Sequence, residues 1–282
     1  QFNNNSSHTI KGFPELLNVG GNLIFEQNTS VIIKGFSKLE AINGSVLIER
    51  NNQLTDIEGF ELLKTTELDF NIQENDNLTE IRGFNEFNTI KGDLKLIRND
   101  KLESLIGFNN LEILNGNLKF LYNNNNIIQG FENLINIDGS LEFTESGEEV
   151  LGFNNLKSIG GHLSFSENSN LKNVNGFVNL ESIGSYFSMY ENEELISVVG
   201  FENLINIEGN LTFSLNSKLE TLSEFQSLEN IDDSFALNYS SLKTINGFNS
   251  LSDPIKNINI SNNNDLETIL GFNSIENLNG SL

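Results

Sequence analysis

Apolar residues recur along this chain with a period of 22–24 residues. The clearest mark of the period is a Gly-Phe pair, and Glu224-Phe225 fills the one slot of the series where that pair is missing. A fixed period of this length is typical of a solenoid, in which each repeat forms one turn and packs only against its neighbours. The Gly-Phe pairs begin at Gly12, Gly35, Gly59, Gly83, Gly107, Gly130, Gly152, Gly176, Gly200, Gly247 and Gly271.

Each turn contains one segment in which apolar and polar residues alternate, such as 163–165 and 211–213. Alternation with a period of two predicts a half-buried strand, and same-sense strands from successive turns must stack as a parallel sheet. The Leu-x-x-Ile stretches of each turn are too short for helices and are interpreted as short strands or tight bends. The predicted fold is therefore all-β, a right-handed parallel β-solenoid of about twelve turns that forms a single continuous domain over residues 1–282.

Three ladders of like residues should run along this solenoid. The first is the phenylalanine of Gly-Phe, the second is aliphatic Leu/Ile, and the third is an asparagine that follows the strand. A buried polar ladder is costly unless it is hydrogen-bonded, so we expect each asparagine to satisfy main-chain groups of its own bend and of the adjacent turn. The ladder residues are Asn28, Asn51, Asn75, Asn99, Asn123, Asn168, Asn192, Asn216 and Asn263, with Ser146 and Ser240 in two turns.

The repeated run G-x-L-x-F/I-x-x-N-x-x-L-x-x-I-x-G-F resembles the receptor L domain, a relative of leucine-rich repeats. The resemblance covers essentially the whole chain. It implies an extracellular or cell-surface protein that is not an enzyme, and it assigns no ligand-binding residue. The chain departs from the receptor family in its greater regularity and in its lack of cysteine.

Composition and charge narrow the classes of function. The chain has 16 Lys+Arg against 39 Asp+Glu, a formal net charge of −23, which disfavours nucleic acid as a partner. The absence of cysteine excludes disulfides and thiolate metal sites, and two histidines leave little scope for a multi-histidine centre. No apolar run approaches the roughly 18 residues of a membrane span. We predict no cofactor and no metal.

The two ends of the sequence align with neighbouring positions of one turn. Leu282 falls at the first inward position of a strand, Phe2 falls at the second, and neither end carries the atypical capping repeat that solenoids usually need. An uncapped turn exposes core and strand edge to another chain. We therefore predict a structural protein of a filament, stalk or surface layer that stacks head-to-tail on itself or continues the same array. An arbitrary boundary is the alternative. The end-stacking candidates are Phe2, Ile10, Phe13, Leu278 and Leu282.

The outward strand residues suggest a second class of function. Early turns mix apolar residues with charge, whereas the last five turns carry mostly small polar residues. A solvated face is the simplest interpretation. The alternatives are a lateral packing surface between fibres and a docking face for a partner. The docking face would make the protein a cell-surface adhesin or receptor ectodomain that binds a protein or glycan on the sheet face, for which the candidates are Ile97, Leu121, Tyr122 and Tyr190.

Some carboxylates lie in register on neighbouring turns, namely Asp69 with Asp93 and Glu26 with Glu49. A separation of about 4.8 Å between strands is close to that of retaining glycosidase pairs. The repeat has no long insertion that could build a cleft, so an enzyme is not predicted. Such pairs repel, and a bound Ca²⁺ would be reasonable there, but no calcium-binding motif is present. His162 is expected to be an exposed side chain with no nucleophile geometry.

Several Asn-x-Ser/Thr sequons could carry N-linked glycan if the protein is secreted. Asn28 also begins a sequon, but it belongs to the buried ladder, so we do not expect its modification. The candidates are Asn43, Asn77, Asn210, Asn238 and Asn259.

Overall fold

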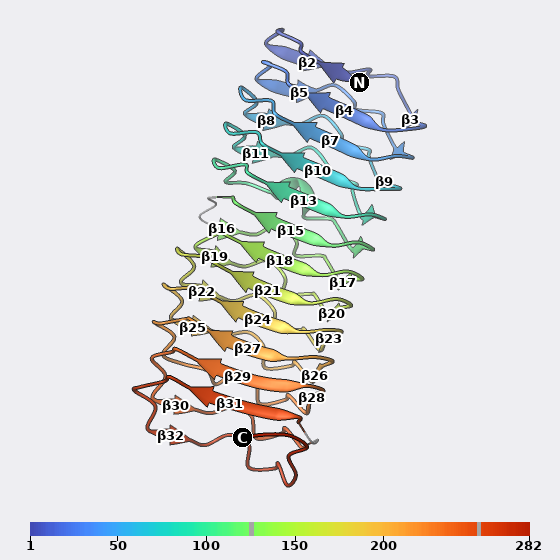
Figure 1. Ribbon diagram of the computed structural model, residues 1–282. Helices are drawn as coiled ribbons and strands as arrows, with labels where there is room; N and C mark the ends of the chain where they lie inside the picture. Colours follow the sequence, from blue (N-terminus) through green and yellow to red (C-terminus); the bar gives the residue numbers. More distant parts are fainter. Residues whose placement is uncertain (124–126, 253–254) are drawn as a thin grey trace. The chain divides into compact units, whose positions relative to one another are not determined.

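The computed structural model describes residues 1–123, 127–252 and 255–282, and this part of the chain is almost entirely β-structure. It contains two compact units, Gln1–Gly139 and Ser140–Leu282. In each unit, strands from successive turns lie side by side in parallel, about 24 residues apart in the sequence (Figure 1). A single 3₁₀ turn, η1 (Ile106–Phe108), is the one helical element of the described residues. The predicted all-β parallel solenoid is thus confirmed.

The first unit has strands on three sides of its turns. The Leu-x-x-Ile stretches, for which the sequence predicts either short strands or tight bends, form two-residue strands in most turns. The first sheet contains β1 (Phe2–Asn3), β4 (Leu23–Glu26), β7 (Val46–Glu49), β10 (Phe70–Gln73), β13 (Leu94–Ile97) and β15 (Leu118–Leu121). The second contains β3 (Asn18–Val19), β6 (Ala41–Ile42), β9 (Thr65–Thr66), β12 (Thr89–Ile90), β14 (Ile113–Leu114) and β17 (Asn136–Ile137). The third contains β2 (Thr9–Lys11), β5 (Ile32–Lys34), β8 (Asp56–Ile57) and β11 (Glu80–Ile81), and β16 (Ile127–Ile128) lies at the same place in a later turn.

The second unit repeats this arrangement. Its widest sheet contains β18 (Leu141–Thr144), β21 (Leu163–Ser166), β24 (Phe187–Tyr190), β27 (Leu211–Ser214), β29 (Ser234–Asn238) and β31 (Asn257–Ser261). A second sheet contains β20 (Ser158–Ile159), β23 (Ser182–Ile183), β26 (Asn206–Ile207) and β28 (Asn230–Ile231). The third side carries β19 (Glu149–Val150), β22 (Asn173–Val174) and β25 (Ser197–Val198), followed by the pair β30 (Thr244–Ile245) and β32 (Thr268–Ile269).

The phenylalanines of Gly-Phe form a buried spine in each unit. The rings of Phe36 and Phe60 stack with centroids 4.9 Å apart and planes 7° apart, and those of Phe153 and Phe177 do so at 5.3 Å and 1°. Such pairs contribute about 0.5–1.5 kcal/mol beyond the burial of their area. The predicted aromatic ladder is confirmed in the interior turns, whereas Phe13 is exposed.

The asparagine ladder is buried and bonds in both directions along the solenoid. The Oδ1 of Asn75 accepts the main-chain N–H of Asn51 at 3.0 Å and its side-chain amide at 3.1 Å. The Nδ2 of Asn75 donates to the carbonyl of Ile48 at 2.9 Å. In the second unit, Ser240 keeps half of this pattern, because its N–H and hydroxyl both donate to Asn263 Oδ1. Each turn therefore satisfies buried polar groups of the adjacent turn, as the sequence predicted.

The residue before each ladder position has a left-handed backbone. Its φ lies between 45° and 59°, although none of these residues is glycine. This conformation costs roughly 1–2 kcal/mol for a residue with a Cβ, so the hydrogen bonds of the adjoining ladder must hold it. The left-handed residues are Asn4, Gln27, Arg50, Glu74, Arg98 and Tyr122 in the first unit, and Glu145, Glu167, Glu191, Leu215, Tyr239 and Asn262 in the second.

The turns differ in length at one corner. Eleven residues always separate the start of a Gly-Phe slot from the first inward strand residue, as from Gly59 to Phe70. The distance from the ladder residue to the next slot varies instead. The shortest such bend runs from Ser146 to Gly152, where Gly147 adopts a φ of 84° that a residue with a Cβ rarely takes.

Candidate functional site

A second polar ladder lies at the residue that precedes the inward strand in several turns, and we call it the strand-start ladder. In the first unit, Asp69 Oδ1 accepts the Asp93 N–H at 2.9 Å, and Asp93 Oδ1 accepts the Asn117 N–H at 2.7 Å. In the second unit, Asn210 Oδ1 accepts the Ser234 N–H at 3.1 Å. Sequence reasoning missed this ladder, although an Asn, Asp or Ser directly before most of the alternating segments was a usable signal.

The Asp69 and Asp93 carboxylates are therefore bound to the main chain of neighbouring turns. Lys95 Nζ lies 2.7 Å from Asp93 Oδ2 and 3.9 Å from Asp69 Oδ2. Burial opposes ionisation of Asp93, but the hydrogen bond from the Asn117 N–H and the contact with Lys95 outweigh it and lower the pKa of Asp93. Lys95, which the sequence places beside this pair, thus offsets the repulsion between the two acids.

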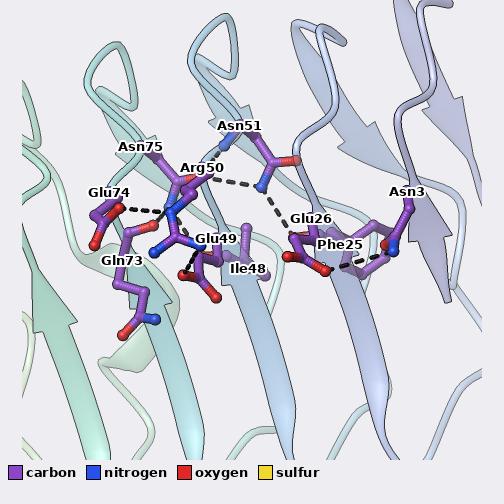
Figure 2. A network of polar contacts seen from close by, with 10 residues as sticks. All are labelled: Asn3, Phe25, Glu26, Ile48, Glu49, Arg50, Asn51, Gln73, Glu74 and Asn75. Carbon is purple, nitrogen blue, oxygen red and sulfur yellow. Dashed lines mark hydrogen bonds and ion pairs between the residues drawn. The ribbon is translucent and has the colours of Figure 1, made fainter.

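The other in-register pair, Glu26 and Glu49, belongs to a polar network on the sheet face of the first unit (Figure 2). Arg50 Nη1 lies 2.9 Å from Glu49 Oε1, and its Nε lies 2.8 Å from Glu74 Oε2. The hydrogen bond to Glu74, followed by the charges of Glu49 and Glu74, raises the pKa of Arg50. Asn3 Nδ2 donates to Glu26 Oε2 at 3.4 Å. Among the described residues, no group of three or more His, Asp or Glu side chains could hold a metal ion.

His162 is not the lone exposed side chain that the sequence suggested. Its Nδ1 lies 2.9 Å from Ser140 Oγ, its Nε2 lies 3.3 Å from Glu142 Oε1, and its ring stacks on Tyr186 with centroids 4.4 Å apart. Burial and, after it, the charge of Glu142 raise the pKa of the Tyr186 hydroxyl. The buried Ser140 hydroxyl also accepts the His162 main-chain N–H at 3.1 Å, which gives this serine a place in the strand-start ladder.

Three of the four sheet-face candidates lie together in the first unit. Ile97 and Leu121 are in register on β13 and β15, and both are partly exposed. Tyr122 follows Leu121, is 40% exposed, and has the Arg98 guanidinium 4.9 Å from its ring centroid. The fourth candidate, Tyr190, is 40% exposed at the end of β24 in the second unit.

On the strands around Tyr190, from β21 to β31, the outward residues of the second unit's widest sheet are uncharged. Two columns of outward residues run across β21, β24, β27, β29 and β31, and every member is a neutral side chain. The columns are Ser164, Ser188, Thr212, Ala236 and Asn259, and Ser166, Tyr190, Ser214, Asn238 and Ser261.

The end-stacking candidates differ in exposure. Phe2 is partly buried because its ring stacks on Phe25 at 4.9 Å, and Ile10 is buried in β2 against β5. Phe13 is 60% exposed and Leu282 is 94% exposed, while Leu278 is partly exposed. Phe2 and Ile10 thus pack against the adjacent turn, whereas Phe13 and Leu282 have open surfaces.

The sequons also divide by exposure. Asn43 and Asn259 are exposed. Asn77, Asn210 and Asn238 are partly buried, and their side chains hold hydrogen bonds with Lys101, Ser234 and Ser261 respectively. Asn28 is buried in the ladder, as expected.

Comparison with known proteins does not assign this chain to a family. No protein-family model and no curated protein matches the chain. The resemblance to the receptor L domain therefore depends on the repeat residues alone and stays a prediction. Within its described residues, the structure has no helix with the length and hydropathy of a membrane span.

Proposed function

We propose that this chain is a non-enzymatic structural solenoid that belongs to a filament, stalk or surface layer outside the cell. The observation that carries the proposal is the direction of the ladder hydrogen bonds. Because Asn75 bonds to Asn51 and Ile48 of the preceding turn, a turn is completed by its neighbour. Every turn presents nearly the same row of rings, donors and acceptors, so like turns can be added in series.

The outer turns indicate what such a neighbour would cover. Ile269 pairs in register with Ile245, which is fully buried, yet Ile269 is 49% exposed. Phe13 occupies the same slot as the fully buried Phe36 and is 60% exposed. Covering one such side chain would contribute about 1.5–3 kcal/mol. The covering turn can come from a continuation of the same chain or from a second copy.

The experiment is the assembly of the purified chain, followed by sedimentation and electron microscopy as the salt concentration rises. Screening of the −23 charge should promote assembly, and fibres should give an axial spacing near 4.8 Å, the separation of neighbouring strands. Ile269→Asp should block growth, because it places a charge where a like turn would pack. Ile196→Asp is the matched control, since Ile196 is 45% exposed away from that turn.

Growth that is equally impaired by both substitutions, or that is unaffected by Ile269→Asp, would count against stacking of turns. A chain that stays as short discrete rods at all salt concentrations would favour the second candidate function. That candidate is a surface adhesin or receptor ectodomain that binds a protein or glycan on its sheet face. The uncharged columns around Tyr190 are the observation that favours it.

A further inference from the structure

Two neighbouring strands of the first unit carry an unusual cluster for so acidic a chain. On β13 and β15, Lys95 is in register with Lys119, and Ile97 is in register with Leu121. Arg98 and Tyr122 follow these strands at the left-handed positions. We call these six residues the β13–β15 patch. It places three of the 16 cationic residues beside two aliphatic side chains and one aromatic ring. Aromatic residues and arginine around an apolar centre are typical of protein–protein interfaces.

Arg98 is the residue of this patch that is open to a partner. Its side chain is exposed, and its guanidinium lies 4.9 Å from the centroid of the Tyr122 ring. Within the described part of the chain, no carboxylate lies within ion-pairing distance of Arg98. Lys95, in contrast, is paired with Asp93 at 2.7 Å. Arg98 therefore offers a free, oriented donor group next to partly exposed apolar surface.

The same column of left-handed residues shows which acceptor group this guanidinium would bind. Arg50 and Glu74 occupy the left-handed positions of adjacent turns, and the Nε of Arg50 lies 2.8 Å from Glu74 Oε2 (Figure 2). In the second unit, the equivalent positions of adjacent turns are Glu167 and Glu191. Glu167 is exposed and Glu191 is partly exposed, and no cation of the described residues pairs with either. Arg98 in the first unit and the two glutamates in the second thus occupy the equivalent left-handed position of their turns, and none of them has an ion-pair partner among the described residues.

We propose that the β13–β15 patch docks sideways onto a second copy of this chain, with Arg98 against the Glu167 and Glu191 carboxylates of that copy. Charge complementarity selects this occupant: Arg98 is an exposed cation, whereas the chain as a whole carries −23. The Arg50–Glu74 pair within the chain shows that an arginine and a glutamate at left-handed positions can form an ion pair. The contact is lateral, so it goes beyond the axial stacking of turns and does not depend on it.

The test is the self-association of the full chain, measured by sedimentation velocity over a concentration series. Arg98→Glu should weaken lateral association about tenfold or more, because it opposes like charges across the contact. Lys64→Glu is the control, since Lys64 is exposed elsewhere in the first unit and the substitution changes the net charge equally.

A charge swap makes the test specific. Adding Glu167→Arg to the Arg98→Glu chain should restore association, whereas adding Glu220→Arg, an exposed position outside the column, should not. Association that survives Arg98→Glu would overturn the proposal. So would a loss that Lys64→Glu reproduces, or one that Glu167→Arg fails to restore, because the patch would then bind something other than a second copy. The axial test with Ile269→Asp is unaffected by either result.

Discussion

Replacement of Asn75 by alanine isolates the contribution of the buried asparagine ladder to stability. The substitution removes the acceptor of the Asn51 N–H and the donor to the Ile48 carbonyl, both of which are buried. A buried main-chain group without a partner costs about 1–3 kcal/mol, so two such groups predict a loss of about 2–6 kcal/mol in the free energy of unfolding. Asn75→Ser should lose less, because a serine can keep the bond to the next turn, as Ser240 does with Asn263.

The assay is urea denaturation followed by circular dichroism, combined with hydrogen exchange at the Asn51 amide. Asn52→Ala is the matched control, since Asn52 is exposed in the adjoining bend, and it should change stability by less than about 0.5 kcal/mol. Exchange at Asn51 should accelerate in Asn75→Ala and stay slow in Asn52→Ala. A loss below about 1 kcal/mol, with the Asn51 amide still protected, would refute the idea that side-chain amides hold the turns together.

Two further predictions concern the strand-start ladder and the close packing of turns beside it. Because the folded-state pKa of Asp93 lies below its unfolded value of about 3.9, its carboxylate stabilises the fold above that pH, and this contribution is lost as the pH falls through the folded pKa. Asp93→Asn should therefore flatten the acid-side fall in unfolding free energy, measured by urea titrations across that range, and an unchanged profile would contradict the assignment. At Gly116, an added Cβ would lie 2.4 Å from the Gly92 carbonyl oxygen, so Gly116→Ala should cost about 1–3 kcal/mol. Gly20→Ala, where nothing lies within 4 Å, should leave the melting temperature nearly unchanged, and equal melting temperatures for the two variants would argue against the close packing of turns.

The sequence was sufficient to predict the parts of the fold that repeat one residue type. The Phe36–Phe60 spine and the Asn51–Asn75 ladder each need one kind of side chain, because ring stacking and two-way amide bonding have few substitutes. The same residue type therefore recurs at a fixed period, which can be recognised in the sequence. The strand-start ladder was missed because Asn, Asp and Ser can each accept the same main-chain N–H, so no single letter repeats.

The left-handed column was harder still to predict. Arg50, Glu74 and Leu215 share one backbone conformation without sharing any preference for it. The conformation comes from the bend and the adjacent ladder, so the residue itself carries no signal. The pairing of Arg50 with both Glu49 and Glu74 could not be predicted for the same reason: it depends on where that bend points the side chains.

The corner between the ladder and the next Gly-Phe slot decides how this chain can change in length. One residue inserted between Gly59 and Phe70 would turn the inward side chains of that strand outward and break its register with both neighbours. The corner tolerates such changes, since the bend from Ser146 to Gly152 is shorter than the bend from Asn51 to Gly59. Whole turns can thus be added or removed, or this corner shortened, without shifting the register of the strands. This corner is therefore the place in each turn where a longer loop with a new binding specificity could be inserted.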